Sequence, residues 1–139
     1  MILVLDTSQE NVFIALWDET KSIWHSQESF LGGRELNSLI IKKLDTTFSH
    51  SCECENVVMG IVIAAGPGSF TGLRIGMSVA NTIAYVRDVP IVAIPVTKSI
   101  EDLLQKGLKV LKSRGASFGG AVTPHYGSEP HITKPKLKG

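Results

Sequence analysis

The chain has 139 residues, of which 43% are hydrophobic and 19% are charged, and its formal net charge is +1. These values are ordinary for a soluble globular protein, and the length is enough for one domain with a core of its own. A membrane-spanning protein is excluded, because no apolar run approaches the roughly 20 residues that a span requires. The first residues also lack the basic start of a signal peptide, so we expect a cytoplasmic protein without membrane contact.

The cysteines and the distribution of charge indicate whether the chain has disulfides, a zinc site or a surface for RNA. Cys52 and Cys54 lie too close together for an easy disulfide, and two ligands are too few for a structural zinc site, so we expect reduced cysteines in a loop. The net charge is −4 over residues 1–97 and +5 over residues 98–139. We expect the basic C-terminal part to be a solvated tail; the alternative is a segment that contacts RNA phosphates.

Three strands are predicted before the first helix, over residues 2–5, 12–17 and 23–30. The second run is rich in β-branched and aromatic residues, which favour strands. The third is mostly polar, so we expect it to lie near an edge of the sheet. The links between the three runs are short, and strands joined in this way pair antiparallel.

Two helices and two further strands follow. Apolar residues recur at helical spacing from Arg34 to Phe48, which predicts an amphipathic helix. Val57–Ala65 is almost wholly apolar, as expected for a strand that is covered on both faces. A long helix is predicted from Ser69 to Arg87. Pro90–Val96 has the pattern of another apolar strand, with proline at its tolerated first position.

Beyond this strand, Thr97 is expected to cap a helix that Gly107 ends. The order β-β-β-α-β-α-β-α predicts an α/β fold of the ribonuclease-H-like or actin-like class, with a single lobe and a mixed five-stranded sheet. We assign residues 1–107 to this lobe. We assign residues 108–139 to a short connection and a basic C-terminal tail, in which residues 121–122 are candidates for a last short strand.

Residues 66–76 read G-P-G-S-F-T-G-L-R-I-G and join a strand to a helix. Glycine is favoured where another surface comes close, and a helix N-terminus attracts anions, so the joint indicates either a tightly packed corner or an anion site. Asp6-Thr7-Ser8 is a second candidate for holding a phosphate or Mg²⁺, although it is equally typical of a turn that bonds its own backbone. The candidate nucleotide or phosphate site comprises Asp6, Thr7, Ser8, Gly66, Gly68 and Ser69.

Other active-site patterns are weak in this sequence. A two-metal nuclease needs several converging carboxylates, but the long helix offers none before Asp88. No two histidines have the spacing of a helical metal site, and Ser69 is not in the G-x-S-x-G elbow of hydrolases. A peptidase therefore lacks both a metal pair and a recognisable nucleophile. The enzymatic alternative that stays open is a nucleotide-binding phosphotransferase or ATPase-like lobe that uses Asp6, Thr7 and the Gly66–Gly72 loop.

The long helix carries a strip of small residues at four-residue spacing: Gly72, Gly76, Ala80 and Ala84. Such a strip lets a neighbouring element approach the helix backbone closely. The neighbour is either the preceding helix of the same chain or a helix of another subunit. In the second case, the two helices form an exposed dimerisation or docking face.

The glycine-rich motif, followed by A-N-T-I-A-Y, closely resembles the TsaB (YeaZ) family. The opening I-L-V-L-D-T-S and the closing P-H-Y-G-S-E-P-H-I-T-K-P-K are also similar to that family. Its members are bacterial subunits of the machinery that forms N6-threonylcarbamoyladenosine at position 37 of tRNA.

The resemblance implies an actin-like (ASKHA) fold and a subunit with no catalytic residue, metal or cofactor of its own. It implies that the chain binds and activates a TsaD-type threonylcarbamoyl transferase, with a TsaE-type ATPase as a further partner. A homodimer in isolation, and contact with tRNA only through the complex, are implied as well. Carried over by motif, the docking face comprises Leu36, Leu39, Ile40, Lys43, Leu73, Gly76, Met77 and Ala80.

The chain departs from the family pattern in three places. Family members are longer and have a second lobe, and we expect this chain to lack most of that lobe and any cleft between lobes. Gly33-Arg34-Glu35 stands where the family often has histidine-serine-glutamate. Gly127-Ser128 follows Tyr126 where the family usually has an arginine.

Overall fold

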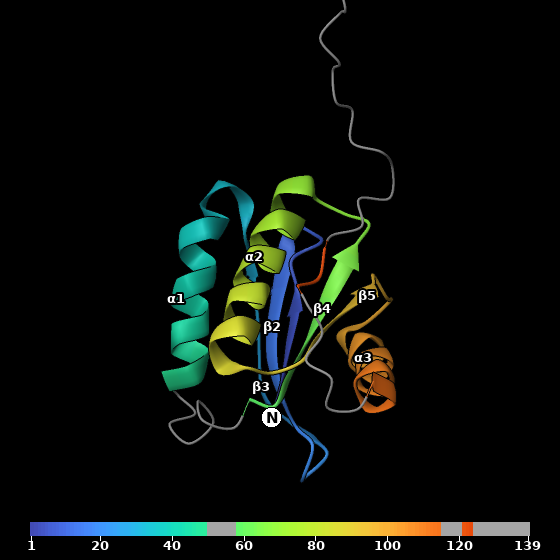
Figure 1. The fold of residues 1–139 in the computed structure, drawn as a ribbon. Helices are drawn as coiled ribbons and strands as arrows, with labels where there is room; N and C mark the ends of the chain where they lie inside the picture. Colours follow the sequence, from blue (N-terminus) through green and yellow to red (C-terminus); the bar gives the residue numbers. More distant parts are fainter. Residues whose placement is uncertain (50–57, 115–120, 124–139) are drawn as a thin grey trace, which may run out of the picture.

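The structure is a computed structural model that describes residues 1–49, 58–114 and 121–123. They form a five-stranded sheet with helices on both faces (Figure 1). The strands are β1 (Ile2–Asp6), β2 (Asn11–Asp18), β3 (Ile23–Leu31), β4 (Gly60–Gly66) and β5 (Ile91–Pro95). The helices are α1 (Leu36–Ser49), α2 (Phe70–Arg87) and α3 (Ile100–Arg114), and a 3-10 turn, η1 (Gly33–Glu35), precedes α1. None of these described helices is both long and apolar enough to cross a membrane.

The strand order across the sheet is β3-β2-β1-β4-β5, so β3 and β5 form the edges. β2 pairs antiparallel with both β1 and β3, as expected for strands joined by short turns. β4 pairs parallel with both β1 and β5, because a helix lies between the paired strands in the chain and carries it back across the sheet. The prediction of an α/β fold with a mixed five-stranded sheet is confirmed, and so is the edge position of the third strand.

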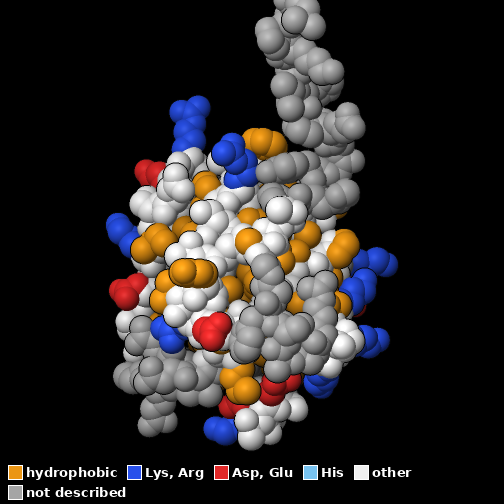
Figure 2. All heavy atoms as spheres, viewed as in Figure 1, with side chains coloured by type: hydrophobic (Ala, Val, Ile, Leu, Met, Phe, Trp, Pro, Cys, Tyr) orange, Lys and Arg blue, Asp and Glu red, His pale blue; other side chains and the backbone are white. Residues whose placement is uncertain are grey.

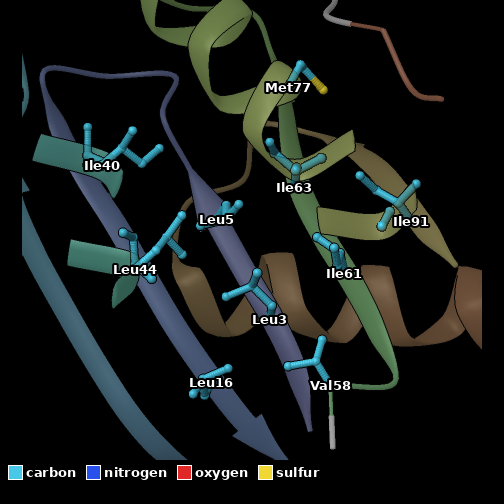
Figure 3. Close-up of a cluster of buried hydrophobic side chains, with 14 of the residues drawn as sticks. Leu3, Leu5, Leu16, Ile40, Leu44, Val58, Ile61, Ile63, Met77 and Ile91 are labelled. Atoms are coloured by element: carbon cyan, nitrogen blue, oxygen red, sulfur yellow. The ribbon is translucent and has the colours of Figure 1, made fainter. Parts of the chain in front are cut away.

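The sheet has a hydrophobic core on each face. Alternate residues of a strand point to opposite faces, so Leu3 and Leu5 of β1 contribute to one core while Ile2 and Val4 contribute to the other. α1 and α2 cover the first face and α3 covers the second (Figure 1). β4 is buried along its whole length, as its apolar sequence predicts. Figure 3 shows the first core, beneath α1 and α2: Leu3, Leu5, Leu16, Ile40, Leu44, Val58, Ile61, Ile63, Met77 and Ile91 are labelled.

α3 differs from the sequence prediction at both ends. The Thr97 hydroxyl donates to the Ser99 carbonyl at 2.7 Å, and the Ser99 hydroxyl accepts from the Asp102 backbone N–H at 3.1 Å. Ser99, rather than Thr97, therefore caps the first turn. The helix also continues through Gly107, so the prediction that this glycine ends it is wrong, and the lobe boundary that we assigned at residue 107 falls inside a helix.

Close packing explains the glycine in α3. A Cβ atom at Gly107 would overlap both Cγ atoms of Val62, a fully buried residue of the inner strand β4. Without a side chain at this position, the helix backbone rests directly on the sheet. Gly107 is therefore a contact between α3 and β4.

Residues 121–123 do not form the short strand that was a candidate there. The Val122 backbone pairs instead with the side chain of Asn81 on α2, and its own side chain packs against the core beneath α1 and α2. Our expectations for Cys52, Cys54 and the basic tail concern residues outside the described ranges.

The glycines of α2 let this helix lie directly against the turn after β1. A Cβ atom at Gly72 would overlap the Thr7 carbonyl oxygen, and a Cβ atom at Gly76 would overlap the Thr7 hydroxyl. Ala80 and Ala84 continue the strip and are buried in the core beneath α2. The small residues therefore serve packing within the chain, and at the two glycines the neighbour is the end of β1 rather than α1 or another subunit.

Replacing Gly107 by alanine is expected to destabilise the protein, although alanine favours a helix over glycine by about 1 kcal/mol. The added methyl group collides with Val62, and overpacking of this kind costs about 1–3 kcal/mol. The free energy of unfolding from chemical denaturation measures the change. Gln105→Ala, at an exposed position of the same helix, is the control and should shift stability by less than about 0.5 kcal/mol. If the glycine variant is as stable as the control, α3 does not rest on β4 as described.

Gly76→Ala is expected to lower stability for the same reason, by about 1–3 kcal/mol, because the methyl group enters the space of the Thr7 side chain. Ser78→Ala, two residues along the same helix and exposed, should leave stability within about 0.5 kcal/mol of the unmodified protein. Thermal unfolding of the isolated chain provides the comparison. A gain in stability at residue 76 would mean that this side of α2 faces open space.

Candidate functional site

The candidate site lies where β1 and β4 end and α2 begins. Ser69 is the N-cap residue of α2, and its hydroxyl accepts from the Gly72 backbone N–H at 3.1 Å. The Ser69 N–H donates to the Ser8 carbonyl at 2.7 Å, which ties the helix start to the turn after β1. Gly68 lies so close to the same carbonyl that no side chain would fit. The two sequence motifs that we singled out are therefore neighbours in space.

Two of the three polar side chains in the turn after β1, those of Asp6 and Ser8, are hydrogen-bonded to each other. Asp6 Oδ1 accepts from the Ser8 backbone N–H at 2.9 Å and from the Ser8 hydroxyl at 2.5 Å. Thr7 and Ser8 are fully buried, and the Thr7 hydroxyl has no hydrogen-bond partner among the described residues because it is enclosed beneath Gly76. The Gly66 carbonyl, at the end of β4, accepts from the Val96 N–H at 2.9 Å.

This geometry favours the tightly packed corner over the anion site. In this turn Asp6 Oδ1 and Ser8 bond each other and Thr7 is inaccessible, so only the second Asp6 oxygen is left among these side chains to hold Mg²⁺. Within the described ranges, no group of three His, Cys, Asp or Glu side chains is arranged to hold a metal ion. Hydrogen bonds from the backbone N–H groups of Lys21 and Thr20 lower the pKa of Asp18, but this carboxylate belongs to the last residue of β2 and is not part of the corner.

A hollow of about 390 Å³ lies close by, and the sequence reasoning did not identify it. The turn after β1, the η1 turn and the first turn of α2 supply its walls, so no single stretch of sequence signals it. Arg34 is exposed at this hollow. The lining residues are Gln9, Glu10, Val12, Gly32, Gly33, Arg34, Leu36, Ser69, Thr71 and Gly72.

Most of the predicted docking face is buried inside the chain. Six of its eight residues have almost no exposed surface: Leu36, Ile40, Leu73, Gly76, Met77 and Ala80. They fill the space between the two helices and the sheet, where the apolar positions of an amphipathic helix belong. The prediction that these six form an exposed face is therefore wrong for the isolated chain.

The other two predicted residues are half-buried and lie on the β3 side of α1. Lys43 Nζ lies 2.8 Å from Glu28 Oε1 of β3 and 5.7 Å from the ring centroid of Phe30. Leu39 is one helical turn before Lys43 and so follows the same side. These two residues lie at the outer edge of α1, away from α2.

A different set of apolar residues is accessible along the junction of α1 and α2. The Arg87 guanidinium lies 5.7 Å from the ring centroid of Phe48, so these two residues mark the sides on which the helices meet. Ile41 lies two helical turns before Phe48, and Ile83 lies one turn before Arg87. Val86, Val79 and Ile75 follow the same side of α2 as Ile83. All of these residues are exposed or half-buried, and Ile41 and Val86 are the most open, with 56% and 74% of their surface exposed. We call this set the apolar seam: Ile41, Phe48, Ile75, Val79, Ile83 and Val86. Figure 2 shows hydrophobic side chains at the surface across the face that α1 and α2 cover.

Comparison with protein families gives a match over residues 35–105, to the family described as TsaD: tRNA N6-adenosine threonylcarbamoyltransferase. This range covers about half of the chain and runs from the start of α1 into α3. It includes the glycine-rich joint and both helices of the apolar seam.

Curated relatives are named TsaB. The chain is 30% identical to the tRNA threonylcarbamoyladenosine biosynthesis protein TsaB of Bacillus subtilis over 128 residues, which cover 90% of this chain and 49% of that protein. It is 33% identical to TsaB of Haemophilus influenzae over 93 residues, which cover 67% of this chain and 38% of that protein. The chain thus spans half or less of the length of the relatives that it matches.

Solved structures lead to the same relatives. YeaZ from Pseudomonas aeruginosa superposes with a TM-score of 0.61 at 26% identity, over 68% of this chain and 43% of that one. A second structure, of an uncharacterized protein with similarity to peptidase YEAZ from the same organism, gives the same TM-score and identity over 42% of its length. The match to the family model, the TsaB relatives and the YeaZ structures agree: the chain belongs to the TsaD family as this model defines it, within the TsaB (YeaZ) branch.

Proposed function

We propose that this chain is a non-catalytic partner subunit that binds and activates a TsaD-type threonylcarbamoyl transferase. The reaction would be the formation of N6-threonylcarbamoyladenosine at position 37 of tRNA. The observation that carries the proposal is the similarity to TsaB proteins, which are named for threonylcarbamoyladenosine biosynthesis. The chain spans half or less of those proteins, so the proposal assigns their role to this part of their length.

A binding role, rather than catalysis, is supported by the packed corner. General acid–base or metal chemistry needs polar groups that are free to face a substrate. At the end of β1, one oxygen of the Asp6 carboxylate accepts both bonds from Ser8, and the Thr7 hydroxyl is enclosed by α2. No observation favours the nucleotide-binding alternative over this reading.

The apolar seam is the surface that we propose for docking. It is continuous along two helices, and Ile41 and Val86 are large hydrophobic side chains with more than half of their surface exposed. Exposed hydrophobic side chains that gather along one junction are typical of protein interfaces. The proposed surface keeps the two helices that the sequence suggested and replaces the buried residues by those on the outside.

The remaining assignments are part of the same proposal. A homodimer of the isolated chain would use the same seam, because two copies related by a twofold axis bury identical patches. A TsaE-type ATPase would join as a further partner, and tRNA would be contacted only through the assembled complex.

Ile41→Glu and Val86→Glu are each expected to weaken binding to a TsaD-type subunit at least ~10-fold, because a buried, unpaired carboxylate opposes docking. Both positions are exposed, so the variants should fold like the unmodified chain. Co-purification followed by titration calorimetry measures the loss.

Gln105→Glu adds the same charge at an exposed position of α3, on the opposite face of the sheet, and serves as the matched control. This variant should bind like the unmodified chain. Normal binding by both seam variants, or equal loss in the control, would place the docking surface elsewhere.

Titration with Mg-ATP is expected to give no binding heat at millimolar nucleotide concentrations. The physical reason is that the polar groups of the Asp6-Thr7-Ser8 turn are already hydrogen-bonded or buried. A saturable heat that Asp6→Ala abolishes would instead favour the nucleotide-binding alternative. Circular dichroism of that variant checks that the turn still folds.

A further inference from the structure

The side chain of Asn81 on α2 bonds the backbone of residues 121–123, which follow α3 in the sequence. Asn81 Nδ2 donates to the Val122 carbonyl at 2.9 Å, and Asn81 Oδ1 accepts from the Val122 N–H at 2.9 Å. The amide thus bonds both polar groups of one backbone unit, as a neighbouring strand would. Residues 121–123 lie beside α2 in Figure 1, where they are drawn in orange-red.

This contact joins parts of the chain that are far apart in sequence. Asn81 and Val122 are separated by 41 residues. The Val122 side chain packs against the core beneath α1 and α2, so an apolar contact accompanies the two hydrogen bonds. α3, which ends at Arg114, covers the opposite face of the sheet, so the latch holds Val122 on a different face from the helix that precedes it in the chain.

We propose that residues 121–123 form a strap that the Asn81 side chain latches onto the flank of α2. The latch is selective for backbone: its donor and acceptor both match an extended peptide unit, and no side chain of the strap takes part in the two bonds. Its occupant is this chain's own segment, and it fastens residues 121–123 to the face that α1 and α2 cover.

The latch lies on the outer part of α2. Ser78 and Tyr85, three residues before Asn81 and four after it, are exposed on the neighbouring surface of this helix. If the proposed function holds, residues 121–123 lie on the same face of the sheet as the docking surface.

Amide hydrogen exchange of the full chain, in the absence of any partner, tests the latch independently of the proposed function. In the unmodified protein the Val122 amide should exchange at least ~10-fold more slowly than an unstructured amide, because its N–H is bonded and covered. In Asn81→Leu it should lose this protection, while the amides of β1 and β4 keep theirs. Ser78→Ala, an exposed position on the same helix that is not part of the two latch bonds, should leave the Val122 amide protected.

Asn81→Asp provides a second reading in case the leucine variant fails to fold. The carboxylate keeps an acceptor for the Val122 N–H but places an oxygen opposite the Val122 carbonyl oxygen, and the two oxygens repel each other. The Val122 amide should therefore exchange faster in Asn81→Asp than in Ser78→Ala. Rapid exchange of Val122 in the unmodified protein would overturn the proposal. Unchanged protection in a folded Asn81 variant would overturn it as well, because another contact would then hold the strap.

Discussion

The closeness of α2 to the end of β1 is the constraint on which the rest of this structure depends. The Thr7 side chain and backbone occupy the positions where Gly72 and Gly76 would otherwise carry a Cβ atom. Ser8 reaches the N-terminus of the same helix through the Ser69 N–H. Because the helix is held at this distance, Met77 and Ala80 lie in the core, and the opposite side of α2 faces outward.

The close approach of α2 to β1 means that internal packing and docking of a partner must use different sides of this helix. Small residues along a helix permit close packing, and in this chain the packing is internal. A docking surface must therefore be built from what is left outside, which is the apolar seam along the junction of α1 and α2. The same close packing consumes the polar groups of the turn after β1, and this is why we propose a binding role for the chain rather than a catalytic one.

The fold was predictable from the sequence because its signals are local. Apolar runs mark the strands, helical spacing marks α1 and α2, and short links dictate which strands pair antiparallel. The prediction of a helix end at Gly107 failed because it used only the neighbouring residues in the sequence. A glycine after an apolar helical pattern is typical of a helix end, and only the contact with Val62, far away in the sequence, explains its place inside α3.

The location of the candidate site could be predicted from the sequence, but the availability of its polar groups for a ligand could not. The sequence indicated that the Asp6-Thr7-Ser8 turn and the glycine-rich joint mattered, and they are neighbours in space. Whether polar side chains face a ligand or each other depends on distances that spacing does not encode. The strip of small residues could not be interpreted from the sequence for the same reason. Glycine and alanine at four-residue spacing give the same pattern whether the neighbouring element is a turn of the same chain or a helix of another subunit. The strap held by Asn81 had no sequence signal beyond an unremarkable asparagine on a helix.

The central claim is that this chain, through the outside of α1 and α2, supports a TsaD-type transferase in tRNA modification. The most direct measurement is the content of N6-threonylcarbamoyladenosine in tRNA from a bacterial strain that lacks its own TsaB. The chain would be expressed there with the TsaD-type subunit of the same genome, either unmodified or with Ile41 and Val86 both changed to glutamate. Our account predicts that the unmodified chain restores the modified nucleoside and that the double variant does not. Absence of the nucleoside with the unmodified chain, or equal restoration by both, would contradict it.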